Sequence, residues 1–98
     1  MMAARERPSH SALEKAWHDR VRRAFSQYQK SSKYANETID EWRLMEEHGS
    51  HPDGVLAIRL ARREESLAMA EYMRVLGLCR DLVVHGVIPE EAPDKDHR

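Results

Sequence analysis

The chain is poor in cysteine, in glycine and proline, and in strongly apolar side chains, and each shortage excludes something. A single cysteine, Cys79, can neither form a disulfide within the chain nor give a metal site a cysteine pair. Leu, Val, Ile and Phe make up 18 of the 98 residues, a share close to that of disordered chains. Disorder also requires a high net charge, and here it is −1. We therefore expect a folded chain with a small core.

Targeting and catalytic signatures are also missing from the sequence. The first residues have no apolar segment of the kind that marks a secretory signal, and no apolar run approaches the ~20 residues of a membrane span. There is no Gly-x-Ser-x-Gly, no glycine-rich phosphate loop and no His-Glu motif of a zinc hydrolase. We expect a cytoplasmic protein with no enzymatic activity, no cofactor and no membrane partner.

Most of the few glycines and prolines gather in the middle of the chain and near its end, which leaves two long segments between them. Ser11 and Glu14 match a capping box at the start of the first segment. Pro52 suits the first turn of the second segment, and Gly86 suits the left-handed residue that closes a helix. The expected elements are a helix over about 11–48, a turn at 49–51 and a helix over about 52–85.

The residues after Gly86 change from apolar to charged. Val87, Ile88 and Pro89 are expected to fold back on the last helical turn as an apolar clasp, which would end the folded domain at residue 89. Residues 90–98 are expected to form a flexible, charged and solvated tail.

Side chains of the first segment show the repeat of a helical bundle or coiled coil. Apolar and small residues recur at alternating spacings of four and three. They are Trp17, Val21, Ala24, Tyr28, Ser31, Ala35, Thr38, Trp42 and Met45. This period predicts an all-α fold.

The second segment has two apolar stripes. The main stripe runs through Ile58, Ala61, Ala68, Tyr72, Val75, Leu76, Cys79, Leu82 and Val83. The second stripe, which lies roughly 100° around the helix from the first, consists of Leu56, Leu60, Leu67 and Leu78. One partner helix cannot cover both, so we expect an antiparallel hairpin that dimerises into a four-helix bundle. These leucines, with Trp17 and Trp42, are the expected dimer or partner interface.

Charge is distributed unevenly along the chain. Residues 1–35 carry a net charge of +5 and residues 36–58 carry −5. A hairpin folded about residue 50 would bring position i near position 100 − i. The acidic residues at 37–41 would then face the arginines at 59–63, which favours the antiparallel arrangement.

Glu65 is unusual because a helical wheel places it inside the main apolar stripe. The expected role is a buried polar layer with Ser31 and Thr38 that sets the register of the helices. Two alternatives remain, a carboxylate at the edge of the helix seam that pairs with an arginine or reaches solvent, and a functional carboxylate.

The leading hypothesis is a non-enzymatic homodimer that binds another protein. One alternative is a nucleic-acid-associated dimer that uses the basic residues Arg20, Arg22 and Arg23. Another is a metal or small-molecule binder around His18 and His85, which the hairpin would bring to the same end.

Overall fold

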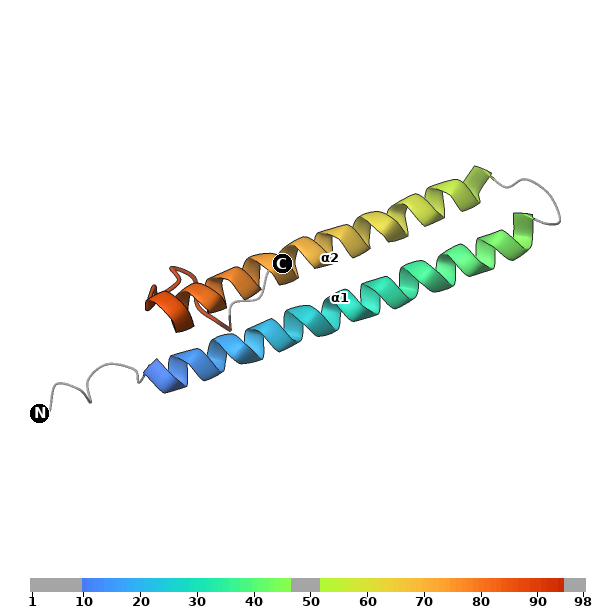
Figure 1. The fold of residues 1–98 in the computed structure, drawn as a ribbon. Helices are drawn as coiled ribbons and strands as arrows, with labels where there is room; N and C mark the ends of the chain where they lie inside the picture. The colour runs from blue at the N-terminus through green and yellow to red at the C-terminus, as the bar shows by residue number, and fades with distance from the viewer. Residues whose placement is uncertain (1–9, 47–51, 95–98) are drawn as a thin grey trace, which may run out of the picture.

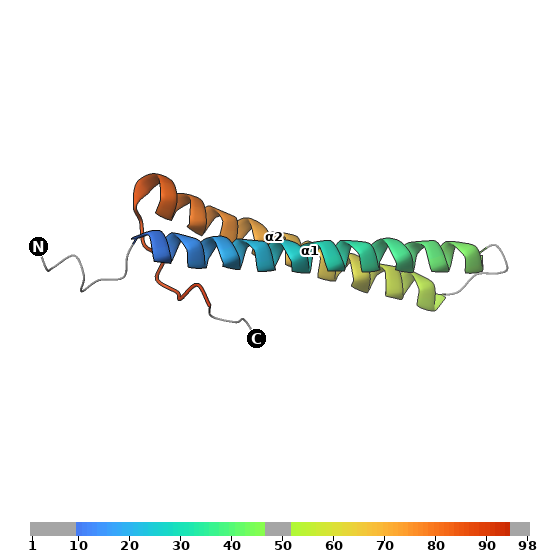
Figure 2. The same ribbon diagram turned by 90° about the horizontal axis from the view of Figure 1, so that it is seen from below.

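The computed structural model describes residues 10–46 and 52–94, and these form two long helices packed side by side and antiparallel (Figure 1). Helix α1 spans His10–Glu46 and helix α2 spans Pro52–His85. The two axes cross at a shallow angle (Figure 2). The described residues contain no strand. The all-helical antiparallel hairpin expected from the periodicity is therefore confirmed.

The ends of α2 follow the expected signals, whereas α1 already includes His10, so Ser11 lies inside the helix and does not cap it as expected. α2 begins at Pro52 as expected, and α1 is described as far as Glu46, so the last two residues expected for the first helix lie outside the described residues. Gly86 adopts a φ of 70° and closes α2, and its N–H donates to the carbonyl of Leu82 at 3.0 Å. The turn expected at 49–51 lies outside the described residues.

The two helices pair about three residues out of the expected register. His18, expected near position 82, lies beside Cys79, and Phe25 lies beside Tyr72 rather than near position 75. Among the described residues, no ion pair joins 37–41 to 59–63.

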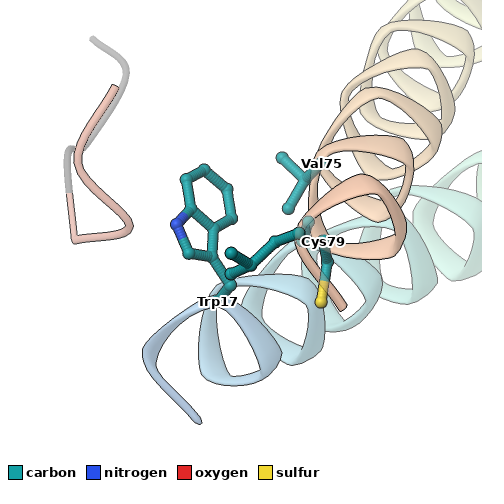
Figure 3. Packing of buried hydrophobic residues seen from close by; sticks show 5 residues of the cluster. Trp17, Val75 and Cys79 are labelled. Carbon is teal, nitrogen blue, oxygen red and sulfur yellow. The ribbon is translucent and has the colours of Figure 1, made fainter. Parts of the chain in front are cut away.

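The core is small and lies mainly at one end of the hairpin. We call the end where α1 begins and α2 finishes the open end, and the opposite end the apex. Seven described hydrophobic residues are buried: Trp17, Ala24, Ala35, Ala61, Val75, Cys79 and Leu82. Figure 3 shows part of the largest cluster, which gathers at the open end around Trp17 and Val75. Because four of the seven are alanine or cysteine, few large side chains hold the helices together.

A close contact between Trp42 and Gly54 packs the apex. Gly54 is buried, and a Cβ atom at this position would lie only 2.5 Å from Cε3 of the Trp42 ring. The missing side chain is therefore what lets the indole approach the first turn of α2.

The chain beyond α2 differs from the expectation at two places. Val87 and Ile88 are 56% and 62% exposed, so they do not form the expected apolar clasp. Residues 90–94, expected to be solvated, instead turn back to α1, where the carbonyl of Pro93 accepts hydrogen bonds. Contacts between charged and polar groups hold these residues against α1, and a helical period contains no information on such contacts.

Neither of the two described helices contains a stretch long and apolar enough to cross a membrane.

Candidate functional site

A row of exposed leucines follows one flank of α2. Leu56, Leu60 and Leu67 are between 53% and 60% exposed, and Tyr34 of α1, beside them, is 59% exposed. An open groove of about 400 Å³ lies between the two helices here. It is lined by Tyr34, Ala57, Leu60, Ala61 and Glu64. We call the three leucines and Tyr34 the leucine patch.

The other expected interface residues lie inside the hairpin. Leu78 is half-buried and packs against the core cluster, and Trp17 is fully buried in that cluster. Trp42 is half-buried against Gly54. These three side chains therefore pack within the hairpin. The sequence could not separate this role from a dimer interface, because the seam of a hairpin and the seam of a dimer show the same period.

A second apolar surface lies on the opposite flank of α2. At roughly 100° per residue, this flank is turned away from the leucine patch. Its exposed members are Met69, Met73, Leu76 and Val83. Phe25 of α1 borders it and packs against Tyr72, with the two ring centroids 5.1 Å apart. The hairpin therefore presents apolar side chains on two flanks.

Ser31 and Thr38 are buried in the helix seam, whereas Glu65 lies half-buried at its edge. The Glu65 carboxylate accepts hydrogen bonds from Ser32 and from Arg62, the latter at 3.0 Å. These two donors, Ser32 first, hold the pKa of Glu65 below its ordinary value. Every buried side-chain nitrogen or oxygen in the described part of the chain has a partner. The arrangement matches the alternative of a carboxylate at the seam edge.

We expect Glu65→Gln to lower the free energy of unfolding by less than about 1 kcal/mol at neutral pH, as for a partly exposed ion pair. Because the folded-state pKa of Glu65 is lowered, its stabilising effect is present above the ordinary carboxyl range and is lost as the pH falls through the lowered value. Urea unfolding at about pH 7 and about pH 3 checks this, since the difference from the parent should be smaller at the lower pH. Glu64→Gln, at an exposed neighbour, is the control.

The two histidines of the open end are placed differently. Nδ1 of His18 lies 3.8 Å from Sγ of Cys79, and His85 is exposed at the end of α2. Burial, with a smaller contribution from Glu14, raises the pKa of the Cys79 thiol, so the thiol stays protonated at neutral pH. Within residues 10–46 and 52–94, no three His, Cys, Asp or Glu side chains gather as metal ligands would.

The arginines of the basic run are engaged within the chain. Arg20 is buried, Arg22 pairs with Asp19, and Arg23 donates to the carbonyl of Pro93 at 3.1 Å. These contacts compete with binding to a phosphate backbone, so the structure adds no support to the nucleic-acid alternative.

A network of charges at the open end was not expected from the sequence. Arg20 donates to Glu71 at 2.9 Å and lies 3.5 Å from Glu91, and Arg74 donates to both carboxylates at 2.9 to 3.2 Å. Arg74 is the main cause of the lowered pKa of Glu71 and of Glu91. The sequence contains one sign of this network: Arg20 stands three residues after Trp17 and so lies within the helix seam, where a charged side chain needs a partner.

Searches of protein-family models, of curated proteins and of solved structures found no match to this chain.

Proposed function

We propose that this chain is a cytoplasmic, non-enzymatic interaction module in which two hairpins pack as a homodimeric four-helix bundle. The observation that carries the proposal is the leucine patch. Leu56, Leu60 and Leu67 follow one another at helical spacing, and all three are more than half exposed. A helix flank of this kind is stable in water when a second apolar surface covers it.

The small core of the single hairpin supports this proposal. Among the described residues, only Trp17, Leu82 and Val75 are large side chains that the hairpin buries completely. Fifteen large hydrophobic residues in the described part of the chain stay exposed. Covering the leucine patch with a second copy would add large apolar side chains to a core that has few.

Charges beside the patch suit a two-fold arrangement. Arg63 and Glu64 are both exposed next to the leucines. Because a two-fold axis brings the same surface of both copies together, a basic residue of one copy can pair with an acidic residue of the other. Such pairs at the rim select the partner and its orientation rather than supply affinity.

A dimer formed through the leucine patch leaves the opposite flank free for another protein. That flank carries Met69, Met73 and Leu76. Methionine side chains are flexible and polarisable, and they adapt to partners of different shape. We therefore assign the binding of other proteins to this flank.

The molecular mass in solution tests the dimer. Sedimentation at micromolar concentration should give twice the mass of the chain, and Leu60→Glu with Leu67→Glu should give a single chain. These two positions are chosen because they are exposed in the hairpin, whereas a charge at the half-buried Leu78 would disturb the hairpin itself. Val55→Glu introduces one such charge at a similarly exposed position on another side of α2, and it should stay dimeric.

Two outcomes would overturn the proposal. If the wild-type chain sediments as a monomer, the proposed dimer is disproved. A dimer that survives the double leucine variant but dissociates with Met73→Glu would place the interface on the opposite flank. Circular dichroism of each variant should show unchanged helix content.

A further inference from the structure

Residues 90–94 cross the open end of the hairpin and contact both helices (Figures 1 and 2). The carbonyl of Pro93 accepts hydrogen bonds from Arg20 at 3.4 Å and from Arg23 at 3.1 Å. Two residues earlier, the carboxylate of Glu91 lies between Arg20 and Arg74. We call residues 90–94 the strap.

Beneath the strap, the side chain of Arg20 in α1 is held in a fixed orientation. The side chain of Arg20 is only 7% exposed, its guanidinium lies 5.9 Å from the centroid of the Trp17 ring, and it donates to Glu71. Figure 3 shows the Trp17 indole extending from α1 toward the side on which the C-terminal segment passes. A guanidinium fixed by an aromatic ring and a carboxylate is well prepared to bind a further carboxylate or carbonyl.

Charge, rather than apolar burial, holds the strap in place. Glu90, Ala92 and Asp94 are exposed, and only Glu91 and Pro93 are half-buried. Exposed residues 87 and 88 connect the strap to α2. Partly exposed ion pairs contribute little stability each and are screened by salt, so the strap can lift at small cost.

We propose that the strap is an internal ligand of a peptide-binding site, and that this site takes an acidic segment of another protein with a glutamate two residues before a proline. Arg20 and Arg74 bind the glutamate carboxylate, and Arg20 and Arg23 bind the carbonyl of the proline. Proline suits this position because it keeps the segment extended and leaves no N–H without a partner. The site is separate from the leucine patch, so it does not depend on the proposed dimer.

Exposure of Trp17 to a quencher reports on the strap in the full-length chain. Trp42→Phe serves as the background, because it leaves Trp17 as the only tryptophan. In this background, Glu91→Arg should repel Arg20 and Arg74, lift the strap and raise the acrylamide quenching of Trp17 several-fold. Glu90→Arg makes the same charge change at the exposed neighbouring residue and should leave quenching unchanged.

A charge exchange separates lifting of the strap from unfolding. Adding Arg74→Glu to Glu91→Arg recreates an attractive pair, and quenching should fall back toward the parent value. The leucine variant Leu60→Glu with Leu67→Glu should keep Trp17 protected, so failure of the dimer and failure of the strap are distinguishable. If Trp17 stays protected in Glu91→Arg, or if the exchange does not restore protection, the strap does not cover this site.

Binding of a synthetic peptide of residues 87–94 tests the site itself. The peptide should bind the Glu91→Arg chain at least about tenfold more tightly than the wild-type chain, because the wild-type strap occupies the site. A peptide carrying Glu91→Lys should not bind. Equal affinity for both chains, or no binding to either, would overturn the proposal. Loss of Trp17 protection on dilution of the Trp42→Phe chain would also overturn it, since the strap would then lie on a second copy.

Discussion

Replacing Trp17 by alanine is expected to remove most of the free energy of unfolding of this chain. Trp17 is the largest fully buried side chain, and it joins α1 to Val75, Cys79 and Leu82. Truncation of a buried tryptophan costs about 3–5 kcal/mol, and small domains have about 5–15 kcal/mol in total. With so few other large buried side chains, the hairpin has little packing that can compensate.

Urea unfolding followed by far-ultraviolet circular dichroism measures this effect. All variants must be compared at one protein concentration, because dimerisation would make the apparent stability depend on concentration. Met73→Ala, at a residue that is 55% exposed, serves as the control and should stay within about 0.5 kcal/mol of the parent. If Trp17→Ala lowers the free energy of unfolding no more than the control does, the indole is not the main stabilising side chain of the core.

Substitution of Gly54 by alanine is expected to destabilise the chain, although alanine is the better helix former. The new Cβ would lie 2.5 Å from Cε3 and 2.8 Å from Cδ2 of Trp42, and both atoms belong to a rigid ring, so the whole indole must move. Overpacking of this kind costs about 1–3 kcal/mol, which exceeds the gain of about 0.5–1 kcal/mol from helix propensity.

Two further variants test this explanation of Gly54. In a Trp42→Leu background the clash is removed, and Gly54→Ala should become stabilising by about 0.5–1 kcal/mol. Gly77→Ala should be stabilising by a similar amount in the parent, because the only atom near its Cβ is Nη2 of Arg80 at 4.0 Å. The same loss for Gly54→Ala in both backgrounds would show that contact with Trp42 is not the cause.

The sequence was most informative about the helices and least informative about what covers them. Alternating spacings of three and four residues predicted α1, and Pro52 and Gly86 predicted both ends of α2. The same period did not say which surface Trp17 contacts, because a wheel identifies an apolar face without identifying its partner. Trp17 faces the second helix of its own hairpin instead of the surface.

The polar contacts required information that a helical period does not contain. The expected pairing of position i with 100 − i puts Glu65 opposite Ala35, but Glu65 accepts a hydrogen bond from Ser32, because the register is shifted by about three residues. The contacts of Glu91 and Pro93 in the strap with Arg20 and Arg23 of α1 join residues 70 to 73 positions apart, and no local pattern predicts such pairs. Long-range charge contacts of this kind are visible only in the folded chain.

The position of the core at the open end also has a kinetic consequence. Trp42 and Gly54 meet across a short stretch of chain, whereas Trp17 and Cys79 meet only after more than 60 residues have been brought together. Because closing a longer loop costs more entropy, we expect the apex to pair first and helix pairing to extend toward the open end. A destabilising substitution near Gly54 would then slow folding, whereas truncation of Trp17 would mainly speed unfolding. The contacts that form last in this hairpin are thus the ones that keep it folded longest.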